Sequence, residues 1–381
     1  MKHFEVKTKI TFGEGALEHL ADLHDVRVLV VADPFVVSSG LIRQVTSRLD
    51  RAGVTYDVYH DVVPDPPIEK VINGVRRLSE FRPDVIVAVG GGSAIDLSKG
   101  IRKFATIADN TLHIRLVAVP TTSGTGSEVT SFAVISDPEH NRKYPLSSED
   151  MLPDEAILDE ELVKSVPASI TADTGMDVMT HAIEAYVSIN NNEFSGALAE
   201  KSVEICGQFL LRSYASCEDS HARRKMHIAS CLAGLAFNSA SLGLTHGMAH
   251  QLGAKFHIPH GRANAILLPY IIEYNSRIDI LSRSRDHYEP CVRKYCNMAR
   301  ILGVSNLNEV TTIRALVAYI QFMNHEMNIP QSISGLGSIS EGEYMAAIDD
   351  MTEAALADAT TATNPRVPTR EEVANLFRKI W

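Results

Sequence analysis

The pattern of apolar and polar positions changes near residue 166. Before it, short apolar runs alternate with amphipathic segments, as in strand–helix–strand units. The clearest run, residues 84–89, shows no alternation, which is typical of a strand covered on both faces. Similar runs predict strands at 26–32, 56–59 and 116–119, and helices are expected at 38–52, at 68–81 and after Gly90-Gly91-Gly92. This order predicts an α/β fold with a parallel, doubly wound sheet.

After Val166-Pro167 the pattern is helical throughout. The segments expected to form helices are 171–188, 195–213, 221–238, 243–255, 261–274, 286–302, 308–328, 340–357 and 369–380. Two of them open with capping boxes, Ser340 with Glu343 and Thr369 with Glu372. Candidate N-caps of the first helix are Thr171, Asp173 and Thr174. We therefore predict two domains, an α/β dinucleotide-binding domain over 1–166 and an all-helical metal-binding domain over 167–381.

Composition narrows the class of protein. The chain has 381 residues, 45% hydrophobic and 22% charged, which is typical of a globular protein of about two domains. Its net charge of −11 argues against nucleic acid as a partner. We also expect no membrane partner, because no apolar run approaches the ~20 residues that span a bilayer. An odd number of cysteines without a Cys-x-x-Cys pair, and no signal-peptide pattern, predict a cytoplasmic protein.

Three of the predicted strands end in residues suited to a nucleotide. Asp33 closes the first run, where its carboxylate could accept both hydroxyls of a ribose. Gly90-Gly91-Gly92-Ser93 opens a helix, so that backbone N–H groups could receive a pyrophosphate. Residues 121–126 add hydroxyls after the last run. The G-x-G-x-x-G fingerprint is not met, because Ile95 takes its last position and the acid precedes the glycines. Together the three loops predict a dinucleotide in a non-standard frame.

The second half of the chain carries a candidate metal site. Asp177 and His181 are four residues apart in a predicted helix and so share one face. His246 and His250 repeat this spacing, and His260 follows ten residues later. One carboxylate with two or three imidazoles suits Zn²⁺ or Fe²⁺, whereas Mg²⁺ and Ca²⁺ prefer more oxygens. A zincin protease is excluded, because His246-Gly247-Met248-Ala249-His250 lacks the glutamate of H-E-x-x-H. Spacing alone leaves open which downstream histidines bind.

These motifs together resemble the iron-containing (group III) alcohol dehydrogenases of the dehydroquinate synthase-like superfamily. The matching stretches are Gly90–Ser93 with Asp96 and Lys99, Pro120–Thr130, Gly175–Glu184, His246–His250, Pro259–Gly261 and Asn364–Arg366. The resemblance covers essentially the whole chain. Within the family it is strongest to the 1-propanol dehydrogenases, through residues 135–138 and 143–146.

The resemblance implies roles for individual residues. The implied metal ligands are Asp177, His181, His246 and His260, with His250 unligated beside the nicotinamide and substrate. The pyrophosphate would lie on Gly91, Gly92 and Ser93, and the rest of the cofactor on Thr121, Thr122, Thr125 and Lys143. An acid at Asp33 would repel a 2′-phosphate, which favours NAD over NADP. The family also implies a homodimer, for which the alternating Phe4, Val6, Thr8, Ile10 and Phe12 could supply a pairing strand.

The expected reaction is reversible hydride transfer between NADH and a small aldehyde. One divalent metal, Fe²⁺ or Zn²⁺, would act as a Lewis acid, and His250 is the candidate proton donor. Phe132, Phe237 and Leu244 suggest a small hydrophobic substrate pocket. Arg262 is either a helix-pairing arginine or a group that recognises an anionic aldehyde such as sulfoacetaldehyde.

Two alternatives and one question of location stay open at this stage. The first alternative is a metal-dependent lyase of the dehydroquinate synthase type, which uses NAD only transiently. The second is a non-catalytic nucleotide-binding module. Association with a microcompartment is also left open, since a short internal signal is not recognisable from the sequence.

Overall fold

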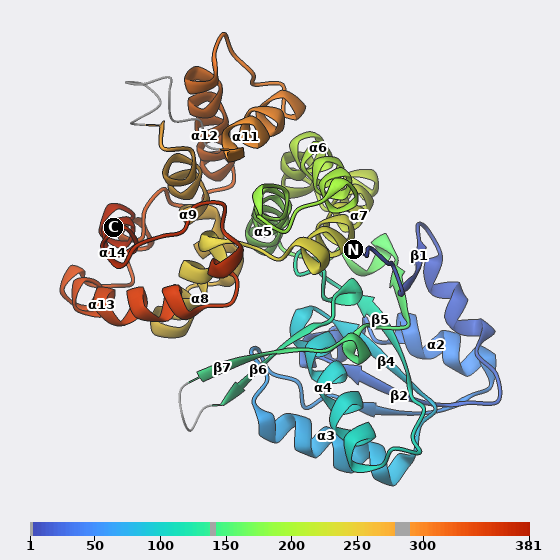
Figure 1. Ribbon diagram of the computed structural model, residues 1–381. Helices are drawn as coiled ribbons and strands as arrows, with labels where there is room; N and C mark the ends of the chain where they lie inside the picture. Colours follow the sequence, from blue (N-terminus) through green and yellow to red (C-terminus); the bar gives the residue numbers. More distant parts are fainter. Residues whose placement is uncertain (1–2, 138–141, 279–289) are drawn as a thin grey trace. The chain divides into compact units, whose positions relative to one another are not determined.

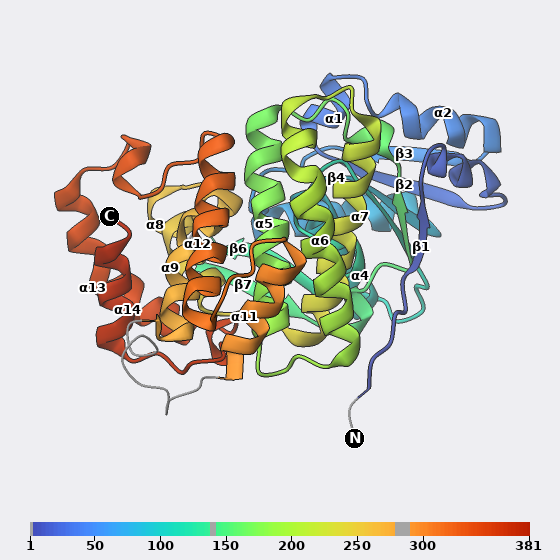
Figure 2. The same ribbon diagram turned by 90° about the horizontal axis from the view of Figure 1, so that it is seen from above.

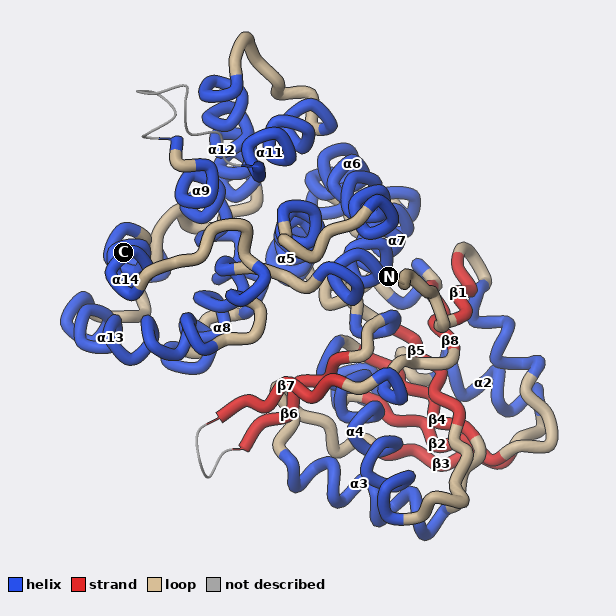
Figure 3. The backbone as a smooth tube through the Cα atoms, in the orientation of Figure 1, coloured by secondary structure: helices blue, strands red, loops and turns tan. Residues whose placement is uncertain are grey.

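The computed structural model describes residues 3–137, 142–278 and 290–381. The chain folds into two compact units, Met1–Val166 and Pro167–Trp381. The described strands all lie in the first unit, and the described part of the second consists of helices and their connections (Figure 3). Each unit is described by itself below.

The first unit is built on a six-stranded sheet with the order β1-β8-β5-β4-β2-β3, in which every pair of neighbours is parallel (Figure 1). Its strands are β1 (Lys9–Phe12), β2 (Arg27–Ala32), β3 (Thr55–Tyr59), β4 (Val85–Gly90), β5 (Arg115–Pro120) and β8 (Glu155–Leu158). The chain runs outward from β2 to β3 and returns on the other side of β2 at β4. Open parallel sheets bind ligands beyond the carboxyl ends of their strands at such a reversal.

Helices cover both faces of this sheet, as the uninterrupted apolar runs predict. Val85, Val87 and Val89 of β4 pack in one hydrophobic cluster with α2 (Arg43–Ala52) and the 3-10 helix η1 (Ala16–Asp22). Ile86 and Ala88 of the same strand face the opposite cluster, which α3 (Ile68–Phe81) and α4 (Gly92–Ala108) complete. The predicted α/β fold with a doubly wound parallel sheet is therefore confirmed. A short helix, α1 (Pro34–Ser38), follows β2.

Three described strands of the first unit were not predicted from the sequence. β6 (Phe132–Asp137) and β7 (Arg142–Ser147) form a separate antiparallel pair, and the four-residue strand β8 is too short to show a period. The alternating N-terminal stretch does form a strand over its last residues, which include Ile10 and Phe12. There β1 pairs in parallel with β8 of its own chain and forms the end of the sheet.

Helices make up the second unit. The described α-helices are α5 (Ala168–Val187), α6 (Glu193–Ala215), α7 (Ser220–Ala240), α8 (Leu244–Phe256), α9 (His260–Ser276), α11 (Pro290–Ile301), α12 (Glu309–Glu326), α13 (Glu341–Ala357) and α14 (Arg370–Lys379). Each lies within a few residues of a predicted helix, although positions 286–289 of one prediction lie outside the described residues. Both predicted capping boxes are present. Figure 2 shows α5, α6 and α7 side by side, and most side chains of α5 are buried.

The predicted N-cap of α5 is wrong. The helix begins at Ala168 with Pro167 as its N-cap, so Thr171, Asp173 and Thr174 lie inside it. The Thr171 hydroxyl donates to the carbonyl of Pro167, and the Thr174 hydroxyl donates to that of Ile170. Threonine hydroxyls inside a helix commonly return to the carbonyl four residues earlier, and the sequence does not distinguish this use from capping.

Within the described residues, no single helix is long and apolar enough to cross a membrane. By length and composition α7 and α8 pass such a test only as a pair, and they are bent by 107° relative to one another.

The close approach of α9 to α5 yields a first prediction. A Cβ at Gly261 would lie 2.1 Å from the backbone oxygen of Asp173, so Gly261→Ala must push the two helices apart. We expect the free energy of unfolding in urea to fall by about 1–3 kcal/mol. Gly342→Ala on α13 is the control, because a Cβ there meets nothing within 4 Å and alanine favours a helix. Equal stability of the two variants would contradict the tight α5–α9 contact.

Candidate functional site

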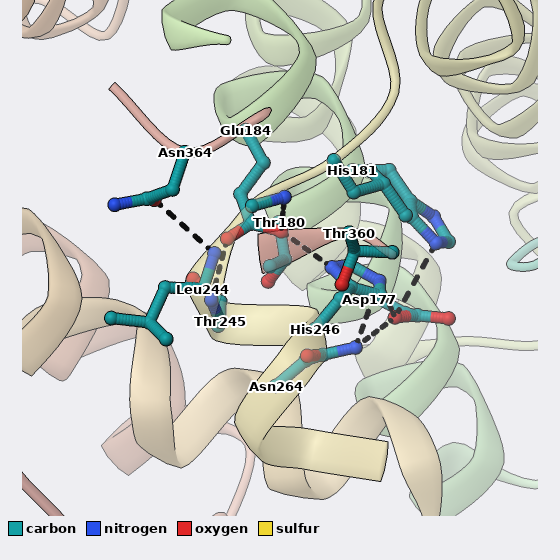
Figure 4. Close-up of polar contacts among 12 residues, drawn as sticks. Asp177, Thr180, His181, Glu184, Leu244, Thr245, His246, Asn264, Thr360 and Asn364 are labelled. Carbon is teal, nitrogen blue, oxygen red and sulfur yellow. Dashed lines mark hydrogen bonds and ion pairs between the residues drawn. The ribbon is translucent and has the colours of Figure 1, made fainter. Parts of the chain in front are cut away.

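Four side chains of the second unit converge on one point, and Figure 4 shows Asp177, His181 and His246 among them. Asp177 and His181 stand one turn apart on α5, His246 lies in the first turn of α8, and His260 is the first residue of α9. One possible ligand atom of each lies within 4.8 Å of the others. The Oδ1 atom of Asp177 is 3.9, 3.7 and 3.6 Å from the Nε2 atoms of His181, His246 and His260 respectively.

The pKa shifts of two members of this cluster favour metal binding. Burial alone would raise the pKa of Asp177, but the charges of the three histidines outweigh it and hold that pKa below its usual value. Burial, with repulsion from the neighbouring histidines, places the pKa of His246 well below its usual value. A metal requires a carboxylate and neutral imidazoles as ligands. His260 is the most accessible of the four, with 42% of its side chain exposed.

Glu184 fixes the orientation of His246. Its carboxylate lies 2.6 Å from Nδ1 of His246, so the ring donates there and leaves the lone pair of Nε2 directed at the cluster (Figure 4). Glu184 also accepts from the N–H groups of Gly243 and Thr245 at the start of α8. Histidines that bind metals are commonly held by a carboxylate through their other nitrogen.

The start of α8 also depends on Asn364. Its Oδ1 accepts from the N–H of Leu244, between the two N–H groups that Glu184 takes. A Cβ at Gly243 would lie 2.8 Å from Glu184 and 2.9 Å from Asn364, so these two side chains leave space only for glycine. Asn364 therefore helps to place His246, two residues into the helix.

His250 stands one turn after His246 and outside the group of four. Its Nδ1 lies 2.8 Å from Asp358, which also accepts from the N–H and the hydroxyl of Thr360. Burial would raise the pKa of Asp358, but His250 and Thr360 outweigh it and lower that pKa strongly. The ring of His250 stacks on that of His260, with centroids 5.4 Å apart.

The predicted substrate residues fall in different places. The ring of Phe237 on α7 lies 4.7 Å from that of His181, and Leu244 is buried at the start of α8. Phe132 belongs to β6 of the first unit. Arg262 donates from Nε to Asp173 at 2.9 Å, which links α9 to α5. This contact is the one expected of a helix-pairing arginine.

In the first unit the predicted cofactor loops meet at the carboxyl ends of β2 and β4. Asp33 uses one carboxylate oxygen to cap α1 through the N–H of Val36. The other oxygen faces Gly90, where a Cβ would come within 2.7 Å of it. Gly90 also has a φ of +155°, a conformation that other residues rarely adopt.

The third loop, after β5, lies against the same glycines. A Cβ at Gly91 would lie 3.3 Å from the hydroxyl of Thr122, and one at Gly92 would lie 2.8 Å from the methyl group of Thr125. The N–H of Thr121 donates to the carbonyl of Gly90. Ser93 is the second residue of α4. Lys143 pairs with Ser136 across β6 and β7, but its side chain lies outside the described part of the chain.

Two residues of the glycine motif anchor the segment that follows this loop through hydrogen bonds of their side chains. Lys99 on α4 is fully buried and donates to the hydroxyl of Ser127 and the carbonyl of Phe132. Asp96, one turn earlier, accepts from the same hydroxyl and from the N–H of Val134. Burial lowers the pKa of Lys99 to about 8, against the opposing charge of Asp96. These contacts fasten the segment after the threonine loop to the helix that the glycines open.

Comparison with known protein families decides the identity of the chain. Residues 7–160 match the model of the iron-containing alcohol dehydrogenases, and residues 171–381 match the model of the C-terminal part of the Fe-containing alcohol dehydrogenase family. The chain belongs to the iron-containing alcohol dehydrogenase family. The resemblance seen in the sequence is thus confirmed, and the protein is an oxidoreductase.

Two curated relatives match this alcohol dehydrogenase along essentially their whole length. The 1-propanol dehydrogenase PduQ of Citrobacter freundii is 40% identical, with all of both chains covered. The NADPH-dependent butanol dehydrogenase of Clostridium saccharobutylicum is 36% identical over all of this chain and 98% of the relative. Both are named as dehydrogenases, and the lyase alternative is not supported.

Solved structures show the same fold. The alcohol dehydrogenase from Oenococcus oeni superposes with a TM-score of 0.90 at 31% identity, covering 100% of both chains. The sulfoacetaldehyde reductase from Bifidobacterium kashiwanohense, solved in complex with NAD⁺, gives a TM-score of 0.85 at 26% identity. It covers 100% of this chain and 98% of that structure.

Three residues of this alcohol dehydrogenase contact the cluster or His250, and the sequence motifs predict no role for them. Glu184 follows Asp177 by seven residues and so shares its helix face, a signal that the reading could have used. Asn264 follows His260 by four residues in the same way. Asp358 contacts His250 across 108 residues of sequence, and no local pattern indicates that contact.

The role of Glu184 yields a second prediction. Glu184→Gln keeps the shape of the side chain but removes the charge that holds His246, so affinity for Zn²⁺ should fall by about 10–100-fold. Competition with a chelator, followed by elemental analysis, measures this loss. Glu200→Gln is the control, because Glu200 accepts from Tyr186 and Asn297 and is not among the four candidate ligands. Unchanged affinity in Glu184→Gln would refute the role.

Proposed function

We propose that this alcohol dehydrogenase carries out reversible hydride transfer between NADH and a small aldehyde. The observation that carries the proposal is the convergence of Asp177, His181, His246 and His260 on one point. The proposal assigns the coenzyme to the first unit and the metal to the second. Lys143, Thr121, Thr122 and Thr125 would complete the coenzyme site.

The residues present fit a single divalent metal. Three imidazole nitrogens and one carboxylate oxygen are typical ligands of Fe²⁺ or Zn²⁺, and four protein ligands leave a further position if the metal becomes five-coordinate. Glu184 already holds His246 with the correct nitrogen facing inward. When bound, such a metal supplies Lewis acidity towards a carbonyl oxygen. Phe237, against His181, would form an apolar wall beside it.

The coenzyme is proposed to be NADH. Gly91, Gly92 and Ser93 would receive the pyrophosphate at the N-terminus of α4, where the helix favours negative charge. The carboxylate of Asp33 would accept ribose hydroxyls and repel a 2′-phosphate. The name of the butanol dehydrogenase relative shows that NADPH is used within the family, so both coenzymes belong in the assay.

His250 is proposed to move the proton. Asp358 holds its Nδ1, so a protonated His250 would donate from Nε2 to the nascent alkoxide, directly or through water or a ribose hydroxyl. The carboxylate of Asp358 thus lies against the ring nitrogen opposite the one that would donate. Asp358 acts on the reaction only through the orientation and charge of His250.

Assembly and location are part of the proposal as well. We propose a homodimer, which the position of β1 at the end of the sheet supports. The cytoplasm is the proposed location, because the five cysteines, all among the described residues, form no disulfide.

Metal analysis combined with an aldehyde panel tests the function. The purified protein should hold one divalent metal per chain and oxidise NADH with small aldehydes, whereas His260→Ala should lose both properties. His325→Ala, at a largely exposed histidine on α12, should keep both. Metal-free native protein would contradict the proposed metal site. Metal and aldehyde-dependent activity retained in His260→Ala would refute the ligand assignment.

Substitution of Arg262 tests whether the enzyme recognises an anionic aldehyde through this side chain. The name of the sulfoacetaldehyde reductase relative favours testing a sulfonated substrate, whereas the bond from Nε to Asp173 favours a structural role. If the guanidinium recognises an anion, Arg262→Ala should lower kcat/KM for sulfoacetaldehyde about 10–100-fold more than for propionaldehyde. An equal loss on both substrates would contradict anion recognition and leave only the helix-pairing role.

A further inference from the structure

Asn264 lies against the candidate metal ligands, and neither the sequence motifs nor the comparisons give it a role. It stands on α9, one turn after His260, and is fully buried. Its Nδ2 atom is 2.7 Å from Oδ1 of Asp177 and 3.1 Å from Nε2 of both His246 and His260 (Figure 4). Its Oδ1 atom is buried and has no hydrogen-bond partner among the residues that the structure describes.

The amide therefore caps one face of the cluster. Its three partners are three of the four candidate ligand atoms, and the fourth ligand, His181, is not among them. An amide NH₂ group carries only two hydrogens, and here three acceptor atoms surround it. The N–H groups thus use the same lone pairs that a cation would use, and they hold these atoms together without one.

A bound cation changes which end of the Asn264 amide, nitrogen or oxygen, is favoured to point at the cluster. It attracts the lone pairs of the ligands and repels the N–H dipole that points at them. A half-turn about the last side-chain bond exchanges nitrogen and oxygen without changing the volume filled. The rotation also places the side-chain oxygen opposite a positive charge. In the structure as described, this oxygen has no hydrogen-bond partner among the described residues.

We propose that Asn264 is a fifth residue of the metal site. Its N–H groups pre-form the site before the metal binds, and its side-chain oxygen faces the metal afterwards. This inference rests on the proposed metal site, and its role is to position ligands and tune the metal. A residue that acts in this way should alter metal affinity and the coordination of the metal, besides any effect on turnover.

The test compares two substitutions with a matched control. Asn264→Leu keeps a similar size but has no polar atom, and Asn264→Asp places an oxygen where the amide nitrogen stands. Asn324→Leu is the control. Asn324 is equally buried, on α12, and its nitrogen donates to the carbonyl of Ala265. Its oxygen also lacks a partner within the described part of the chain. It is not part of the group of four.

Chelator competition with Zn²⁺ gives the first readout. We expect the Kd of Asn264→Leu to rise about 10–100-fold, while Asn324→Leu keeps the native Kd. Asn264→Asp should bind at least as tightly as the native protein. Its metal-free form should melt at a lower temperature, because the new carboxylate repels Asp177. If Asn264→Asp bound as weakly as Asn264→Leu, the oxygen would not face the metal.

Visible absorption of the Co²⁺-loaded protein gives the second readout, because these bands report the number and geometry of ligands around the ion. The spectrum should change in Asn264→Leu, and it should stay native in Asn324→Leu. A native Kd and a native spectrum in Asn264→Leu would overturn the inference while leaving the proposed function standing. Native protein that binds neither Zn²⁺ nor Co²⁺ would overturn both.

Discussion

The carboxylate of Asp177 is the constraint around which the second unit is arranged. It is only 3% exposed, and a buried charge without partners costs several kcal/mol. Three imidazoles and the amide of Asn264 surround it, and a divalent cation would offset its charge most fully. Most of the side chains of α5 are buried, so this charge lies deep in the unit and its partners must come from neighbouring helices.

The side chains that face ligand positions are themselves held by buried or partly buried polar groups. Glu184 fixes His246 and Asp358 fixes His250, each through Nδ1. The first unit uses the same device, because Asp96 and Lys99 fasten the segment that follows the threonine loop. In both units the positions of the binding groups therefore depend on residues that would not touch the substrate. Substituting such residues should lower the affinity for metal or coenzyme before it affects the chemical step.

Periodicity predicted most of the fold, because apolar runs and helical spacing are local properties. It missed β6, β7 and the four-residue β8, and it misplaced the start of α5, where the Thr171 hydroxyl donates to a backbone carbonyl. The spacing of Asp177 and His181 predicted that they share a face, but only the family resemblance separated His250 from the proposed ligands. Helical spacing places Glu184 and Asn264 on the same faces as Asp177 and His260, but it does not indicate their contacts across 62 and 87 residues, and nothing local indicates the contact of Asp358 across 108.

The central claim is that Asp177 and its histidines hold one divalent metal. The most direct measurement is the metal content of native protein and of Asp177→Asn, which keeps the shape of the side chain and removes its charge. After equal exposure to a chelator, we predict one Fe²⁺ or Zn²⁺ per native chain and none in the variant. Equal metal content in the two proteins would contradict the claim.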